Sequence, residues 1–203
     1  MIIENNHIKS NAWSQRFILS AIFQGLLIIV LTSSGIAIQL MYSSTINMIQ
    51  FLSLSFEGPA KWIFLGYMFY LILITLIAIT AIFYNHLEVN LQRRIRGIKS
   101  VLTWINLVGI NVGGAAAAIT IIYAGLAGSG ILDMMISGGT TNNLKQNTAI
   151  MAEFVLPIAA FSGLLIAGAI VGTIVYFATY FQNPLHLNRR STTNHSIPGG
   201  KMY

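Results

Sequence analysis

The chain has no cysteine among its 203 residues. This absence excludes disulfide bonds, iron–sulfur clusters held by cysteine, thiolate zinc sites, cysteine-ligated copper centres and a cysteine nucleophile. Any catalytic or metal chemistry of this chain would have to come from other side chains.

Charged residues are also scarce, at 8% of the chain against 55% hydrophobic residues. A soluble domain carries about 25% charged residues, so this deficit indicates an integral membrane protein. The net charge of +6 does not indicate nucleic-acid binding. The basic residues lie in short segments beside apolar runs, where they set the orientation in the membrane.

Four long apolar runs predict the fold. They cover about residues 17–41, 62–84, 101–127 and 154–181. Each run is long enough for a helix to cross a bilayer, and the first is too long for a signal peptide, so we expect it to stay uncleaved. We therefore predict an all-α integral membrane protein with four transmembrane helices over residues 16–181. Polar tails are expected at residues 1–15 and 182–203.

Basic residues predict the orientation of these helices. The loop between the second and third runs holds Arg93, Arg94, Arg96 and Lys99. Because Lys and Arg cost roughly 2.5–3.5 kcal/mol each at the bilayer centre, this loop stays at a water-facing surface. Of the 11 basic residues, only those at 61 and 145 fall in segments predicted outside. We expect a multi-pass protein of the plasma membrane with both termini cytoplasmic and the loop facing anionic lipid.

The third and fourth runs carry small residues at helical spacing. On the third run these are Asn106, Gly109, Gly113, Ala117 and Thr120, and on the fourth run Gly168 and Gly172. Small residues four apart let helices approach closely in lipid, so we predict helix-packing faces. Whether the partner helix belongs to this chain, to a second copy or to another subunit stays open. The alternative, a substrate path lined by Asn106 and Asn111, is less favoured because no ionisable residue accompanies the amides.

Few side chains near the spans could perform chemistry. The spans contain no histidine, so we expect no haem or copper held by this chain alone, and no other cofactor. His86 and Glu88 would suggest a proton-entry or anion site, but residues two apart do not face each other on a helix. We expect both to be interfacial residues, with Glu88 pairing with Arg93 or Arg94 if the helix continues. Glu153 is interpreted as a boundary residue near the positive end of the fourth helix.

Four stretches resemble a known group of proteins. They are Glu57–Tyr67 (EGPAKWIFLGY), Tyr84–Glu88 (YNHLE), Asn106–Gly114 (NLVGINVGG) and Tyr123–Gly128 (YAGLAG). These stretches resemble small archaeal membrane subunits associated with haem–copper terminal oxidases. The resemblance covers the second and third runs, and it implies a respiratory complex whose metal-binding histidines belong to a partner chain.

These features together predict a non-catalytic accessory subunit of a multi-subunit membrane complex of energy metabolism. Its partners would be other integral membrane subunits and lipids. One alternative is an accessory subunit of a membrane monooxygenase of the ammonia monooxygenase type. Another is a small transporter or channel formed by self-association, with Asn111 and Glu153 contributing to its path. An enzyme has least support, because no nucleophile–base pair is visible.

Overall fold

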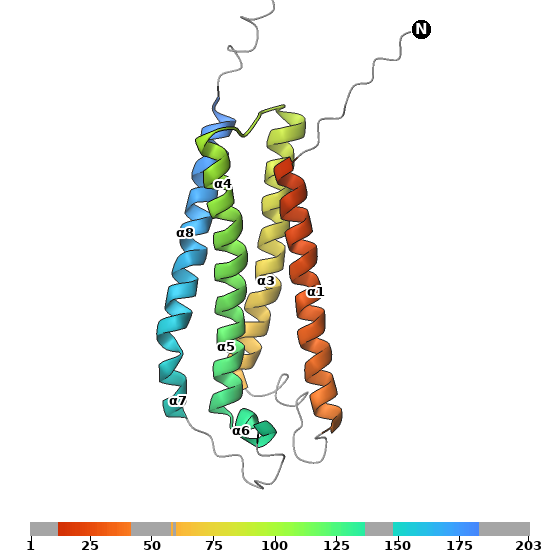
Figure 1. Cartoon of the computed structure of the whole chain (residues 1–203), viewed down its shortest axis with the longest axis vertical. Coiled ribbons are helices and arrows are strands. Elements are labelled where there is room, and N and C mark those ends of the chain that lie inside the picture. Colours follow the sequence, from red (N-terminus) through yellow and green to blue (C-terminus); the bar gives the residue numbers. More distant parts are fainter. Residues whose placement is uncertain (1–11, 42–57, 59, 137–147, 183–203) are drawn as a thin grey trace, which may run out of the picture.

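The computed structural model describes residues 12–41, 58, 60–136 and 148–182, and every regular element in these ranges is a helix (Figure 1). The elements are α1 (Ala12–Met41), α3 (Ala60–Asn85), η1 (His86–Asn90), α4 (Ile98–Val108), η2 (Gly109–Gly113), α5 (Gly114–Gly128), α6 (Ile131–Ile136), α7 (Thr148–Glu153) and α8 (Val155–Tyr180). Both η elements are single π-helical turns that continue the preceding α-helix.

Four helical segments are long and apolar enough to cross a membrane. They are Trp13–Ala37, Lys61–Asn90, Ile98–Gly128 and Ala149–Tyr180. The prediction of an all-helical chain with four potential membrane spans is therefore confirmed at the level of helix length and composition. We call these segments the first to fourth spans.

Several boundaries differ from the predicted ones; the fourth span, for example, begins at Ala149 instead of residue 154. Helix α1 begins at Ala12, so residues 12–15, which we assigned to the polar tail, are helical. The reason is a remote cap on the first turn, described below. Helix α3 runs directly into η1, which reduces the predicted loop to residues 91–97. The chain then turns at Gly97, whose φ of +64° is a left-handed conformation that residues with a side chain rarely adopt.

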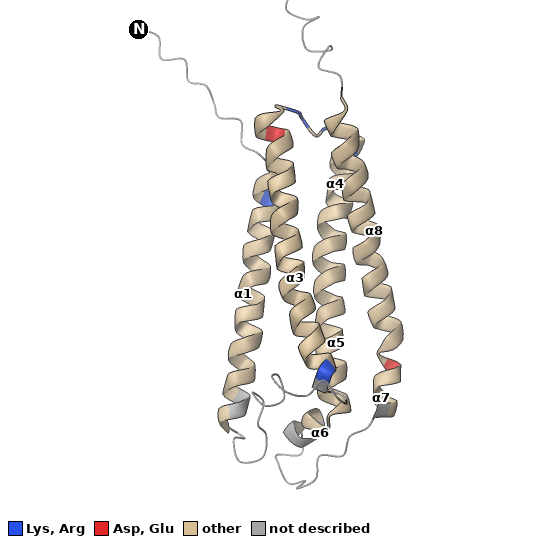
Figure 2. Cartoon of the chain, turned by 180° about the vertical axis from the view of Figure 1, so that it is seen from behind, with Lys and Arg blue, Asp and Glu red and all other residues tan. Residues whose placement is uncertain are grey.

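The spans alternate in direction, and α3 packs between α1 and α5 while α8 packs along α4, η2 and α5 (Figure 1). The start of α1, residues 86–99 and the end of α8 therefore lie at one end of the bundle, which we call the basic end. The charged residues lie near the two ends of the helices, and their middle parts carry none (Figure 2). The predicted separation of basic loop and apolar spans is thus present in the fold.

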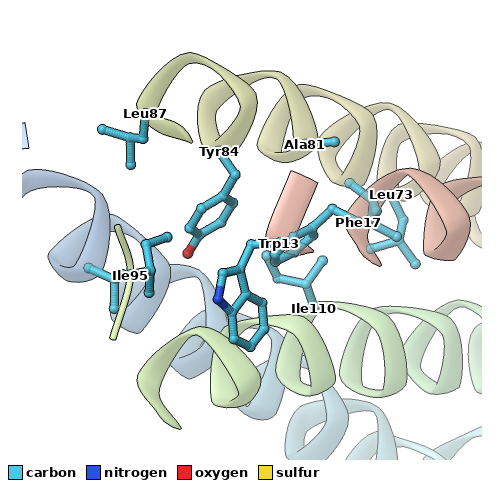
Figure 3. Close-up of a cluster of buried hydrophobic side chains, with 10 residues drawn as sticks. Trp13, Phe17, Leu73, Ala81, Tyr84, Leu87, Ile95 and Ile110 are labelled. Atoms are coloured by element: carbon cyan, nitrogen blue, oxygen red, sulfur yellow. The ribbon is translucent and has the colours of Figure 1, made fainter. Parts of the chain in front are cut away.

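A cluster of buried side chains from all four spans extends from the basic end toward the middle of the bundle (Figure 3). Its ten buried residues are Trp13, Phe17, Leu73, Ile77, Ala81, Tyr84, Leu87, Ile95, Ile110 and Val175. The rings of Phe17 and Tyr84 stack with centroids 4.9 Å apart. The cluster also includes Ile95 of the short loop, so the loop packs onto the core of the spans.

The break between α7 and α8 follows from one proline. Pro157 has no N–H to donate to the carbonyl of Glu153, and its ring crowds that carbonyl. The helix therefore tightens at Phe154, whose N–H bonds to the Met151 carbonyl at 3.2 Å, and α8 starts at Val155. Proline is tolerated there because the first turn of a helix lacks internal partners for its N–H groups.

Candidate functional site

The predicted glycine faces of the third and fourth spans pack against each other within this chain. A Cβ atom added to Gly109 would lie 2.8 Å from the Cα of Gly168, and one added to Gly113 would lie 2.6 Å from the backbone nitrogen of Leu165. Real Cβ atoms do not approach backbone so closely, so the two helices touch main chain to main chain. The partner helix that the sequence left open belongs to the same chain.

Asn106 extends this contact toward the basic end. A Cβ on Gly172 would lie 2.4 Å from the amide of Asn106, so the glycine makes the space that the amide fills. The Asn106 Nδ2 group donates a hydrogen bond to the Tyr84 hydroxyl at 3.1 Å. Its Oδ1 atom and the Thr179 hydroxyl are buried without a hydrogen-bond partner among the described residues. Such an orphaned group costs about 1–3 kcal/mol, which close packing must offset.

The other two residues of the predicted packing face on the third run are Ala117 and Thr120. Ala117 is fully buried, while the hydroxyl of Thr120 bonds to the Ala116 carbonyl of its own helix at 2.6 Å. The third span also packs closely against α3, because added Cβ atoms at Gly66 and Gly114 would overlap Ile122 and Leu73 respectively. The third span therefore has close-packed faces toward both of its neighbours.

A polar cluster joins the first span to the second and third. It consists of Ser20 and Gln24 on α1, Tyr70 on α3 and Asn111 on η2, and we call it the polar joint. The Asn111 Oδ1 atom accepts hydrogen bonds from the Ser20 hydroxyl and from Gln24 Nε2, the latter at 3.2 Å. The Tyr70 hydroxyl donates to Gln24 Oε1 at 2.5 Å. Both Gln24 and Tyr70 are buried.

The π-helical turn η2 contributes Asn111 to the polar joint. Such turns insert one extra residue into an α-helix and often occur at functional positions. Gln24 Nε2 also approaches the backbone carbonyl of Asn111, at 3.5 Å, and Asn111 Nδ2 donates to the Leu107 carbonyl at 2.8 Å. The amide is thus fixed at both ends, and its oxygen is directed at α1. This arrangement favours a fixed link between helices over a mobile ligand-binding group.

Glu88 holds the first turn of α1. Its two carboxylate oxygens accept hydrogen bonds from the backbone N–H groups of Trp13 and Ser14, each at 3.2 Å. These N–H groups have no partner inside their own helix, and the helix dipole makes them attractive to an anion. The prediction that Glu88 pairs with Arg93 or Arg94 is therefore wrong. Arg93 and Arg94 are neighbours of Glu88 in sequence, whereas the turn that it actually caps lies 75 residues away.

Two of the four basic residues near the loop hold the end of α8. The Arg93 guanidinium donates to the backbone carbonyl of Gln182, and Lys99 Nζ donates to that of Ala178 at 2.8 Å. The last carbonyls of a helix lack internal partners and carry the negative end of its dipole. Arg94 and Arg96 are exposed. The four cations predicted to face lipid thus divide into two that bind the protein and two that face outward.

The remaining predicted candidates do not gather into a site. The Asn90 Nδ2 group donates a hydrogen bond to Nδ1 of the His86 ring at 2.9 Å, one turn along the same helix. Glu153 is exposed at the opposite end of the bundle, on α7. Among the described residues no group of three or more histidine, cysteine, aspartate or glutamate side chains is placed to hold a metal ion.

Three members of the polar joint, Ser20, Gln24 and Tyr70, were not predicted from the sequence. A signal was present, since Gln24 is one of two glutamines in the first apolar run. Its partners could not be identified without knowing how the helices are rotated against each other.

The chain matches no protein-family model, no curated protein and no solved structure.

Proposed function

We propose that the chain is a non-catalytic structural subunit of a larger membrane complex, with its basic end toward the cytoplasm and the plasma membrane as its location. One observation carries this proposal. The polar residues of the joint bond to each other, and the other hydroxyl groups described inside the spans mostly bond to carbonyls of their own helix. The polar joint connects helices, and the hydroxyl groups bonded to their own helix are already occupied. Few groups are therefore left to bind or transform a substrate.

The outer faces of the bundle support the same function. Half of the most apolar part of the third span is buried within the chain, but only 6% of the corresponding part of the fourth span. The fourth span therefore presents most of its apolar surface outward, to lipid or to another membrane subunit. The first span is also little buried, at 17%, so two spans offer apolar surface to lipid or to other subunits.

The complex is proposed to be a respiratory terminal oxidase, and this part rests on the resemblance in the second and third spans. A membrane monooxygenase of the ammonia monooxygenase type is the alternative setting for the same structural role. In either complex the metal-binding residues would belong to partner chains.

Photo-crosslinking in native membranes tests the structural role. A photoreactive phenylalanine analogue would replace Phe177, which is 53% exposed on α8, or the control residue Phe17, which is fully buried. We expect Phe177 to give one discrete adduct with a different protein, and Phe17 to give none. Adducts only at multiples of 22.2 kDa would indicate self-association and contradict the proposal, as would isolation of a single uncomplexed species after mild solubilisation.

The second candidate, a small self-associating transporter or channel, is favoured by the position of the polar joint within the spans. Against it, the glycine faces that suggested self-association are already packed within the chain. Flux assays in liposomes distinguish the two functions. A transporter should lose its flux with Asn111→Leu and keep it with Thr75→Val, whose hydroxyl bonds only to its own helix. Flux that is absent, or unchanged by Asn111→Leu, would eliminate this candidate.

A further inference from the structure

One basic side chain at the basic end is held in an unusual setting. The guanidinium carbon of Arg16 lies 4.5 Å from the centroid of the Trp13 ring and 5.0 Å from that of the Trp104 ring. The two indoles meet edge to face with centroids 5.7 Å apart. Arg16 belongs to α1 and Trp104 to α4, so segments about 90 residues apart in sequence build this group together, which we call the arginine–tryptophan cluster.

The aromatic rings fix the cation without neutralising it. Arginine over an aromatic face gains about 0.5–1 kcal/mol at an exposed site, and more when water is excluded. Among the described residues no carboxylate forms an ion pair with Arg16. Glu88, at the end of the adjoining helix, bonds to backbone N–H groups instead. Arg16 is exposed, so its N–H groups remain available to a ligand.

The other cations of the basic end differ from Arg16 in this respect. Arg93 and Lys99 are engaged by the carbonyls at the end of α8. Arg94 and Arg96 are exposed, and no aromatic ring lies over either of them in the described part of the chain. Ordering a free arginine on binding has an entropic cost that a preorganised guanidinium largely avoids. Arg16 is therefore the best-prepared anion-binding group at this end.

We propose that the arginine–tryptophan cluster binds the headgroup of an anionic phospholipid. The planar guanidinium matches the geometry of a phosphate group and can donate two hydrogen bonds to it. Trp104 is 47% exposed, and tryptophan at a membrane surface combines an apolar ring with a polar N–H, which suits the region between headgroup and acyl chain. Arg16 lies one turn inside the start of α1, the level at which a phosphate of the lipid leaflet is expected.

The three tryptophans of the chain provide a direct readout. A Trp62→Phe background leaves only Trp13 and Trp104 as indole fluorophores, both within the cluster. This protein would be reconstituted in phosphatidylcholine vesicles containing a fixed fraction of either brominated phosphatidylglycerol or brominated phosphatidylcholine, because bromine quenches adjacent indoles. We expect a relative binding constant about 3–5-fold in favour of the anionic lipid, as expected for one arginine near the surface.

Variants distinguish this cluster from general attraction to a basic surface. Arg16→Gln should abolish the preference, while Arg96→Gln, which removes an equal charge from the same end, should leave it intact. Equal loss in both variants, or no loss in Arg16→Gln, would overturn the proposal. Arg16→Lys retains the charge without the planar group and should lower the preference about two-fold. If circular dichroism shows that Arg16→Gln does not fold, the two-fold reduction expected for Arg16→Lys tests the proposal in its place.

A final arm separates lipid from free phosphate, which shares the same chemistry. Inorganic phosphate added at constant ionic strength should leave quenching by brominated phosphatidylglycerol unchanged. Displacement of the lipid by millimolar phosphate would mean that the cluster binds soluble anions, and the lipid assignment would be wrong.

Discussion

The third span is connected to α8 and to α1 in different ways. Toward α8 the contact is made by glycines, and backbone meets backbone at Gly109, Gly113 and Gly168. Toward α1 the connection is polar, and Gln24 and Ser20 reach Asn111 across the intervening space. In lipid, apolar side chains gain little from associating with each other, so helices are held by close van der Waals contact or by hydrogen bonds. This chain uses close contact toward α8 and also toward α3, and hydrogen bonds toward α1.

The difference matters for stability, because the two kinds of contact fail differently. A close backbone contact cannot accommodate an added side chain, whereas a hydrogen-bonded contact can be broken without steric overlap. Substitutions at the glycine contact should therefore disrupt the fold more than substitutions at the polar joint. The caps at the basic end, which act only on the first turn of α1 and the last turn of α8, should matter least.

The largest effect is expected at the glycine contact. Gly168→Val would place side-chain atoms where the backbone of Gly109 lies, and we expect a loss of about 3 kcal/mol in the free energy of unfolding. Gly163→Val is the matched control on the same helix, because a Cβ there meets nothing within 4 Å. Unfolding by sodium dodecyl sulfate from mild detergent, followed by circular dichroism, measures both. Equal destabilisation would show that this face is not closely packed.

An intermediate effect is expected at the polar joint. Gln24→Leu removes the hydrogen bonds to Asn111 and leaves the Tyr70 hydroxyl without its acceptor. Interhelical hydrogen bonds in membrane proteins contribute about 0.6 kcal/mol on average, so we expect a loss of about 1–2 kcal/mol for the set. Thr80→Val removes a hydroxyl that bonds only to its own helix and should have little effect. If Gln24→Leu proved neutral or stabilising, the polar joint would not hold α1 in place.

The smallest effect is expected at the cap of α1. Glu88→Gln keeps the hydrogen-bonding shape but removes the negative charge beside the Trp13 and Ser14 amides, and we expect a loss of about 0.5–1 kcal/mol that shrinks in high salt. Amide hydrogen exchange in the first turn of α1 should increase at the same time. Glu153→Gln serves as the control, since that acid is exposed at the other end. Unchanged exchange at residues 13 and 14 would argue against the cap.

The sequence was sufficient to predict the spans but not their contacts. The length of an apolar run and its lack of charged residues can be read from one segment of the sequence. The four apolar segments could therefore be located to within a few residues. The small residues at 109, 113, 168 and 172 were also recognised, because their spacing lies within one helix. Their pairing with each other depends on which faces two separate helices present, and no pattern within a single helix contains that information.

The prediction for Glu88 failed for a related physical reason. A carboxylate beside three arginines invites an ion pair, but an exposed pair gains only about 0–1 kcal/mol. The unpartnered N–H groups at the start of α1 offer two hydrogen bonds and the positive end of a helix dipole. Only the folded arrangement of α1 against α3 brings them to the carboxylate. The fold also brings Arg16 of α1 over the Trp104 ring of α4, a contact that was not predicted from the sequence.

Cysteine accessibility tests most directly the central claim that four spans form one bundle with a single basic end. The chain has no native cysteine, so single substitutions at Gln15, Arg96, Asn111 and Glu153 each carry the only thiol. With a membrane-impermeant thiol reagent we expect labelling of positions 15 and 96 from one side, of 153 from the other, and of 111 from neither. Labelling of 15 and 96 from opposite sides, or of position 111 from either side, would contradict the account.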